Sequence, residues 1–303
     1  CEVGFRPSPF ANQGPRVTTN FRCGTGSRND NAKLAADSHH LQRQDSALSQ
    51  LKPLVSREWQ AFWLAIGFLT RIPMLVRIDY SPRLMNQCSV YFPLVGLVLG
   101  VIYAGLYMAL VQLWSPLVSL ILILGFHLWI TGAFHEDGLA DSVDALGGGY
   151  TLEARLRIMK DSRIGTYGTV ALVVALVLKL ALLDEAQPVW LALILAPMVS
   201  RLAPLMIMGF LPYVTDPDKS KSKPVAEDFS RSRLAIATVF TAIVSLALIP
   251  FETKALLWLV IATLGTAIVW GGYLRRQLGG YTGDTLGASV VFAELVLLLG
   301  LAM

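Results

Sequence analysis

Charge is scarce in this sequence. Only 15% of its 303 residues are Asp, Glu, Lys or Arg, whereas soluble domains carry about 25%. The mean hydropathy is +0.56, which excludes an ordinary soluble domain and indicates a polytopic membrane protein. The net charge of +4 is small and lies mainly in the loops between apolar segments. It therefore indicates membrane topology rather than nucleic-acid binding.

Cysteine and several catalytic signatures are also lacking. The three cysteines, Cys1, Cys23 and Cys88, are widely scattered and have neither disulfide-framework nor metal-site spacing. No Walker P-loop, His-Glu-x-x-His or Gly-x-Ser-x-Gly motif occurs, so ATP-driven transport, zinc proteolysis and serine-hydrolase chemistry lack support. Strand-like alternation is missing as well. The predicted fold is all-α, a polytopic helical bundle in which each helix satisfies its own backbone hydrogen bonds.

The first 56 residues differ in composition from the rest of the chain. They are rich in Ser, Asn, Gln, Arg and Gly and show neither helical nor strand periodicity. We expect residues 1–56 to be a disordered leader. Because the chain begins at Cys1 rather than Met, we also expect that an upstream piece was lost or that the start is misassigned. Residues 57–303 are then the membrane-embedded domain.

Apolar segments begin at Trp59. The first, Trp59–Met74, is short and contains Arg71 and Pro73, so we expect a shallow or interfacial helix that leaves the leader in the cytoplasm. About seven membrane-spanning helices are predicted after it. Their segments are Cys88–Leu113, Leu117–Phe134, Thr169–Leu183, Val189–Leu211, Leu234–Ile249, Ala255–Leu274 and Ala288–Met303.

The loops fall into two classes that alternate along the chain. Short loops poor in cations alternate with long basic loops, and the positive-inside rule places the long ones in the cytoplasm. The long loops are Met74–Gln87, His135–Gly168, Pro212–Arg233 and Arg275–Gly287. The conspicuous polar chemistry of the chain lies in these loops and in the adjoining helix ends.

An acidic cluster occupies His135–Asp144. If this stretch is helical, Asp137, Asp141 and Asp144 stand at i, i+4 and i+7, within an arc of about 60°. Like charges placed so close are destabilising, and hard oxygen ligands suit Mg²⁺, so the pattern predicts a magnesium site. The structural alternative is a solvated acidic helix start.

Two further clusters are suited to binding phosphate. The run Arg157–Thr166 contains Lys160, Asp161 and Arg163, and Arg offers a bidentate fork to phosphate where Lys offers a point charge. The run Gly279–Gly287 places four glycines around one Asp and two Thr, so its backbone can wrap a ligand. The alternatives are ordinary positive-inside charges for the first run and a structural turn for the second.

Ionisable residues also occur inside the apolar segments. Arg201 and Glu294 are functional candidates by default, because a buried charge is costly, and the alternative is a structural pairing between helices. His127 is interpreted as a packing histidine. Lys179 lies close enough to a helix end to reach the interface.

Acidic clusters for a metal and cationic clusters for phosphates suit phosphoryl transfer at a membrane face. Three motifs resemble, in order, those of the cobalamin synthase family, also called adenosylcobinamide-GDP ribazoletransferases. They are Phe134–Asp144, Met159–Thr166 and Gly280–Ala288, with milder matches at Phe68–Pro73, Phe92–Gly96 and Ser200–Arg201. The resemblance runs from about Trp59 to Met303. Glu136 departs from the family pattern and receives no role.

The resemblance implies a multi-pass enzyme of the cell inner membrane that needs Mg²⁺. Its expected substrates are adenosylcobinamide-GDP and α-ribazole or its 5′-phosphate, which it would join with release of GMP. Besides these substrates the expected partner is the lipid bilayer, a homo-oligomer is left open, and no nucleic acid is expected.

The resemblance also implies roles for the site residues. Asp137, Asp141 and Asp144 would hold the metal, and either Asp161 or Asp284 would take the proton of the acceptor hydroxyl. The groups implied to bind substrate phosphates are Lys160, Arg163, Arg201, Gly283 and Thr285.

Two rival hypotheses remain. Asp137–Asp141 also echoes the Asp-Gly-x-x-Ala-Arg start of CDP-alcohol phosphotransferases, but Asp141 stands where those enzymes have Arg, and no Gly-x-x-x-Asp-x-x-x-Asp run follows Asp144. A transporter would spread its charges over broken helices at mid-membrane, whereas here they gather in loops predicted to lie on one side.

Overall fold

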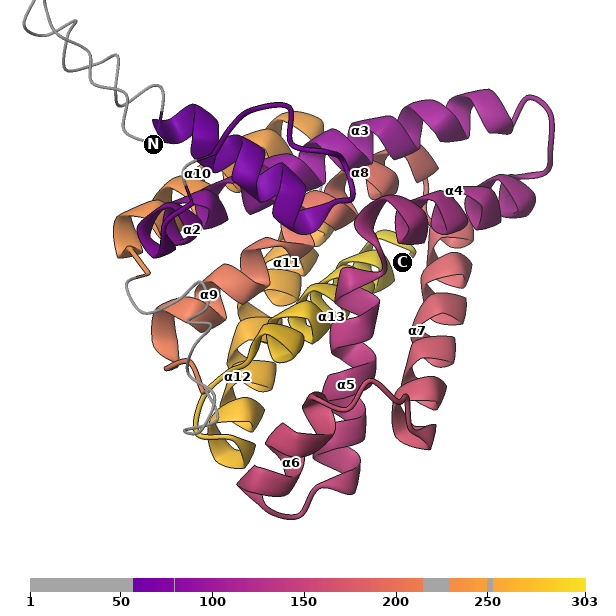
Figure 1. The fold of residues 1–303 in the computed structure, drawn as a ribbon. Coiled ribbons are helices and arrows are strands. Elements are labelled where there is room, and N and C mark those ends of the chain that lie inside the picture. The colour runs from indigo at the N-terminus through magenta and orange to yellow at the C-terminus, as the bar shows by residue number, and fades with distance from the viewer. Residues whose placement is uncertain (1–56, 79, 215–228, 250–252) are drawn as a thin grey trace, which may run out of the picture. The chain divides into compact units, whose positions relative to one another are not determined.

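Helices make up the regular structure of the described part of the chain. The computed structural model describes residues 57–303 except 79, 215–228 and 250–252 (Figure 1). The predicted leader lies outside the described residues. Within them no strand forms, and one isolated parallel bridge joins Tyr213 to Tyr281. The all-α prediction is confirmed.

The described part of the chain begins with a helix over 57–69, and the other helices follow it in sequence. They are α2 (Pro82–Cys88), η1 (Ser89–Tyr91), α3 (Phe92–Leu110), α4 (Pro116–Thr131), α5 (Phe134–Gly148), α6 (Leu152–Met159), α7 (Thr166–Glu185), α8 (Val189–Ser200), α9 (Leu202–Phe210), α10 (Arg231–Leu248), α11 (Thr253–Val260), the π-helical turn η3 (Ile261–Gly265), α12 (Thr266–Gln277) and α13 (Gly283–Leu301).

Six helices of the described part are long and apolar enough to cross a membrane. They are Arg83–Leu110, Thr166–Glu185, Val189–Phe210, Arg231–Leu248, Lys254–Gln277 and Gly283–Leu301. The pair α4 and α5 raises the number to seven if it counts as one broken span. This confirms the prediction of about seven spans. The helix over 57–69 is not among them, and its interfacial position stays a prediction.

The span formed by α8 and α9 lies at the centre of the bundle. Its apolar window is 94% buried, against 17% for α10. Helix α3 packs closely along α8 (Figure 1), because Gly96 and Gly100 are one turn apart and present no side chain there. A Cβ atom on Gly100 would lie 2.7 Å from the Cα of Ile194. Small residues allow such close approach between helices in a membrane.

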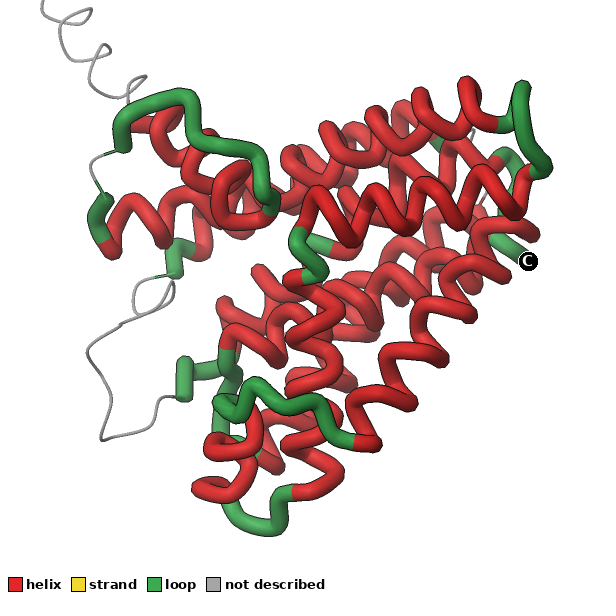
Figure 2. Tube along the Cα trace, turned by 45° about the vertical axis from the view of Figure 1, so that its right-hand side comes forward, coloured by secondary structure: helices red, strands yellow, loops and turns green. Residues whose placement is uncertain are grey.

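A sharp bend separates α4 from α5. Gly132 (φ 68°) and Ala133 (φ 54°) both adopt the left-handed conformation, which ends α4 and turns the chain by 84°. The sequence predicted an apolar segment that continues to Phe134. Because of the bend, the acidic helix α5 is not a continuation of the apolar helix α4, and the two helices form an angle in Figure 2.

Helix α5 packs against α7 and α13 (Figure 1). Its contact with α13 is made through two glycines. A Cβ on Gly138 would lie 2.7 Å from the carbonyl oxygen of Asp284, and Gly287 faces Gly138 across the same contact. This close approach brings the acidic residues of α5 next to the first turn of α13.

Candidate active site

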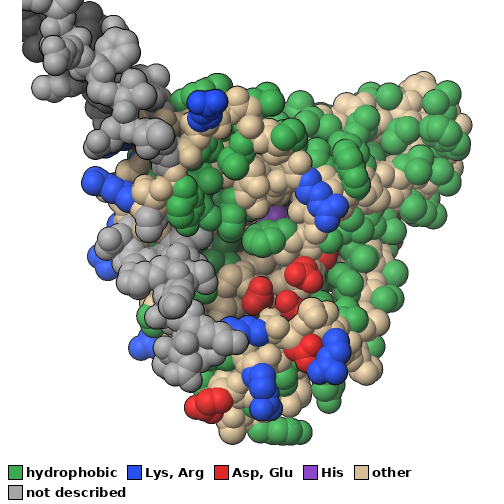
Figure 3. All heavy atoms as spheres, in the orientation of Figure 1, with side chains coloured by type: hydrophobic (Ala, Val, Ile, Leu, Met, Phe, Trp, Pro, Cys, Tyr) green, Lys and Arg blue, Asp and Glu red, His purple; other side chains and the backbone are tan. Residues whose placement is uncertain are grey.

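Three carboxylates from two helices form the acidic part of the candidate site. Asp137 is exposed and Asp141 half-buried on α5, while Asp284 is half-buried in the first turn of α13. Acidic side chains gather in the middle of the face shown in Figure 3. The sequence predicted that Asp137 and Asp141 share a helix face. It did not predict that Asp284, more than a hundred residues away, joins them.

The electrostatics of this cluster oppose full ionisation. Helix α5 is not by itself one of the membrane-spanning helices. Burial, followed by the negative charges of Asp137, Asp284 and Asp144, raises the pKa of Asp141 to about 7. A cation in the cluster would relieve this repulsion.

Asp144 has a different environment from the other two aspartates of α5. It is buried, and its two carboxylate oxygens accept hydrogen bonds from the backbone N–H groups of Gly165 (2.7 Å) and Gly168 (2.8 Å). These groups lie at the start of α7, where unpaired N–H groups and the helix dipole favour a negative charge. Asp144 therefore joins α5 to α7. That it also binds the metal stays a prediction.

No ready-made metal site exists among the described residues, where no three His, Cys, Asp or Glu side chains are arranged to hold an ion. The predicted trio of Asp137, Asp141 and Asp144 is therefore not assembled as such a site. Mg²⁺, however, is usually bound by one or two carboxylates together with water and substrate phosphates. The oxygen donors of Asp137 and Asp141, whose repulsion favours a cation, fit that mode of binding.

The cationic run follows α6. Lys160 ends this helix and is exposed. Arg163 is also exposed and binds Asp161 through two nitrogens, with Nη2 2.6 Å and Nε 3.0 Å from its oxygens. These hydrogen bonds lower the pKa of Asp161 to about 2. Asp161 is therefore a weak proton acceptor, and its partner Arg163 is presented at the surface beside it.

The glycine-rich run forms the start of α13. Thr282 and Thr285 make a capping box, in which each side chain accepts a hydrogen bond from the backbone N–H of the other residue. Thr285 is fully buried, and its hydroxyl donates to the Thr282 carbonyl. Its predicted contact with a substrate phosphate stays a prediction. Gly283, the first residue of α13, is exposed and stays available to a ligand.

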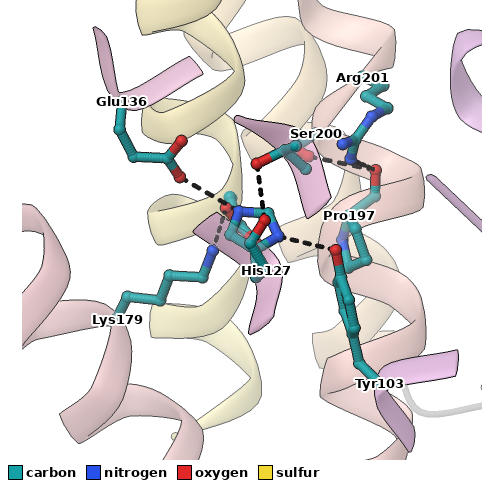
Figure 4. Close-up of polar contacts among 9 residues, drawn as sticks. Tyr103, His127, Glu136, Lys179, Pro197, Ser200 and Arg201 are labelled. Carbon is teal, nitrogen blue, oxygen red and sulfur yellow. Dashed lines mark hydrogen bonds and ion pairs between the residues drawn. The ribbon is translucent and has the colours of Figure 1, made fainter. Parts of the chain in front are cut away.

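Two separate groups of buried polar contacts, together termed the polar network, involve residues of five helices (Figure 4). His127 of α4 contacts Glu136 of α5 through Nε2 at 3.1 Å and the Tyr103 hydroxyl of α3 through Nδ1 at 2.9 Å. Because a carboxylate only accepts, His127 donates from Nε2 and accepts at Nδ1. The sequence predicted a packing role for His127 and none for Glu136. Both are members of this network.

The second part of the network is an ion pair between α7 and α13. Lys179 Nζ donates to Glu294 Oε2 at 2.9 Å, and both side chains are about nine-tenths buried. The prediction that Lys179 reaches the interface is therefore wrong. Glu294 has the structural pairing that was the alternative to a functional role, because burial without a partner would leave either charge costly.

Arg201 lies at the break between α8 and α9 and is 1% exposed. Its Nη1 donates to the Pro197 carbonyl at 2.6 Å (Figure 4). Arg201, Gly283 and Gly287 help to line a cavity of about 300 Å³ that is otherwise mainly apolar. The cavity is thus lined by residues that precede and follow Asp284 in the sequence. It therefore adjoins the acidic cluster.

These features define a polytopic helical membrane protein with a carboxylate cluster beside an apolar cavity. The chain belongs to the cobalamin-5-phosphate synthase family, whose family model matches residues 61–302. It is 44% identical over 240 residues to the adenosylcobinamide-GDP ribazoletransferase of Shewanella piezotolerans, covering 78% of the chain and 92% of the relative. A Vibrio cholerae protein of the same name is 44% identical over 246 residues, covering 79% and 92%. No solved structure matches the chain.

Proposed function

We propose that this protein transfers the phosphorylated corrinoid of adenosylcobinamide-GDP to α-ribazole or its 5′-phosphate and releases GMP. The observation that carries the proposal is that the carboxylate cluster, the cationic run and the cavity all lie within residues 61–302, the range matched by the family model. Relatives that bear the name of this activity cover most of the same range.

The reaction replaces a phosphoanhydride bond with a phosphoester bond. An acceptor hydroxyl oxygen attacks the phosphorus attached to the corrinoid side chain, and a new P–O bond forms. The bond from that phosphorus to the oxygen of GMP breaks, and the hydroxyl proton passes to a protein carboxylate. Such a reaction requires positioning and charge neutralisation more than covalent chemistry by the protein.

We assign the proton acceptor to Asp284 rather than to Asp161. The carboxylate of Asp161 is held by Arg163 at the surface, and its lowered pKa of about 2 makes it a poor base. Asp284 is half-buried, lies against α5 at Gly138 and adjoins the cavity. Its position allows it to meet a hydroxyl that enters from the cavity.

Asp137 and Asp141 would hold Mg²⁺ together with substrate phosphates. When bound, Mg²⁺ neutralises charge on the pyrophosphate. Asp144 keeps α5 in place against α7 through its two backbone hydrogen bonds. Lys160 and Arg163, both exposed after α6, supply positive charge for phosphate oxygens, and Gly283 lets backbone approach them.

The protein would reside in the cell inner membrane with these loops in the cytoplasm. The four long loops identified in the sequence carry most of the basic residues, and basic loops remain on the cytoplasmic side. The substrates are charged and would reach the site from that side.

The proposal is tested with the full chain purified into lipid nanodiscs. Adenosylcobinamide-GDP and α-ribazole 5′-phosphate are added with Mg²⁺, and GMP and the corrinoid product are quantified together. We expect equimolar formation of both and loss of both in excess chelator. Absence of GMP release with a correctly inserted protein would refute the proposed function, and full activity in chelator would refute the metal assignment.

A further inference from the structure

The cavity beside the acidic cluster has aromatic walls. Phe68 stacks on Phe92 with ring centroids 5.8 Å apart and meets Phe134 edge-on at 5.3 Å. On the other side Tyr213 and Tyr281 form an edge-on pair at 5.5 Å. All five rings line the cavity. Walls of this kind favour a flat aromatic ligand, because aromatic rings gain from offset or edge-on contact beyond simple burial.

Two buried polar groups in the cavity wall have no hydrogen-bond partner within the described part of the chain. Arg201 uses only Nη1, and its Nε and Nη2 are unpaired although the residue is 1% exposed. The hydroxyl of Tyr281, also 1% exposed, is unpaired as well. An unpaired buried donor is costly, so two of them in one cavity indicate a ligand with acceptor oxygens.

The unpaired nitrogens of Arg201 define the kind of acceptor. Nε and Nη2 lie on the same edge of the guanidinium plane and donate in parallel, which matches two oxygens of a phosphate. A lipid tail would leave Arg201 and Tyr281 unpaired. A corrin ring is too large for a cavity of about 300 Å³, which is at the lower end of the range for small-molecule sites.

We propose that this cavity is the acceptor subsite. It holds the aromatic base of the acceptor between the rings, while Arg201 and Tyr281 bind its 5′-phosphate. The inference rests on the proposed function, in which α-ribazole, a benzimidazole riboside, or its phosphate is the acceptor. Gly283 and Gly287, which precede and follow Asp284 in sequence, line one part of the cavity. The ribose of the acceptor would lie there, so that its hydroxyl could lose its proton to Asp284.

Binding is measured by calorimetry on the full chain in nanodiscs, with α-ribazole 5′-phosphate and α-ribazole each added without the corrinoid. Arg201→Gln should weaken binding of the phosphate by about 30-fold or more and that of α-ribazole by less than about 3-fold, because only the first loses a charge-assisted pair. Tyr281→Phe should weaken phosphate binding by about 5-fold. The melting temperature of Tyr281→Phe without ligand should not fall below that of the parent, because the substitution removes a buried hydroxyl that has no hydrogen-bond partner.

A cavity-filling pair of variants tests the location independently of these donors. Val290 is 5% exposed and lines the cavity, whereas Val173 is 57% exposed on α7. Val290→Phe should weaken binding of both acceptors by about 10-fold or more, and Val173→Phe should leave both unchanged.

GMP release is assayed on the same preparations to separate the two proposals. If the parent releases GMP and Val290→Phe and Arg201→Gln bind both acceptors as the parent does, the cavity assignment is wrong and the proposed function stands. If Arg201→Gln weakens both acceptors equally, Arg201 does not bind the phosphate. If the parent neither binds the acceptors nor releases GMP, the proposed function is refuted, and the cavity assignment that rests on it is refuted as well.

Discussion

At the scale of single residues, the three aspartates of α5 share a sequence pattern and differ in their neighbours. Asp144 accepts two backbone hydrogen bonds at the start of α7, whereas Asp137 and Asp141 lie toward Asp284. Substitutions should therefore separate stability from catalysis within one helix.

Asp144→Ala should destabilise the protein. The change leaves the N–H groups of Gly165 and Gly168 without their acceptor, at a cost of about 1–3 kcal/mol. Thermal unfolding in nanodiscs, with Glu153→Ala as an exposed acidic control on α6, measures the difference. A melting temperature equal to that of the control would contradict the anchoring role.

Asp137→Asn and Asp141→Asn should each reduce turnover by about 100-fold or more, while the variants insert into the membrane as the parent does. The loss corresponds to several kcal/mol of transition-state stabilisation, at about 1.4 kcal/mol per factor of ten. GMP release at saturating Mg²⁺ is the measurement, and Glu153→Gln is the matched control. Normal turnover in both variants would favour the solvated helix start instead.

Asp141 should also make stability depend on pH when the metal is chelated. Because its pKa is raised to about 7, the folded protein retains this proton at pH values where the unfolded chain has lost it. Stability then falls as pH rises from about 4 to 7. Asp141→Asn should therefore gain more in melting temperature over the parent at pH 8 than at pH 5. An equal gain at both values would show that repulsion in the cluster is weak.

The sequence identified most polar residues of the site but not their partners. Arg201 and Glu294 were singled out because charges inside apolar segments are costly. That Lys179 meets Glu294, 115 residues away, follows from helix packing, which the local sequence does not encode. The capping role of Thr285 was not predicted for a related reason, since a threonine in a glycine-rich loop can cap a helix as well as bind an anion.

At the scale of secondary structure, the contact between α5 and α13 builds the site. It requires that no side chain lie between Gly138 and the backbone of Asp284. The spans themselves could be predicted from the length of the apolar segments. The left-handed Ala133 that precedes α5 could not be predicted, because alanine has no preference for that conformation. Helix α13 begins before the predicted Ala288 because the capping box starts it at Gly283.

Gly138→Ala should reduce turnover by about 10-fold or more. Its new Cβ would lie 2.7 Å from the Asp284 carbonyl oxygen, so α5 and α13 must move apart, and shifts of about 1 Å near reacting groups are costly. Gly125→Ala in α4 is the control, since a Cβ there meets nothing within 4 Å. Unchanged turnover in both variants would show that the site tolerates a wider separation.

At the scale of the whole molecule, the two ends of α7 test the proposed sidedness. Ser162 lies in the exposed loop before this helix, and Glu185 is its exposed last residue. In a background with the native cysteines replaced by alanine, Ser162→Cys should react with an impermeant thiol reagent only from the cytoplasmic side. Glu185→Cys should react only from the outside. The reverse pattern would invert the topology and place the site outside the cell.

The ion pair between α7 and α13 has a consequence for biosynthesis. Lys179 emerges from the ribosome long before Glu294, which belongs to the last helix. During translation the Lys179 cation of α7 therefore has no partner until α13 has been made. A chain truncated before Gly283 should accumulate at lower levels than the full chain, because cellular quality control removes membrane helices that expose an unpaired charge.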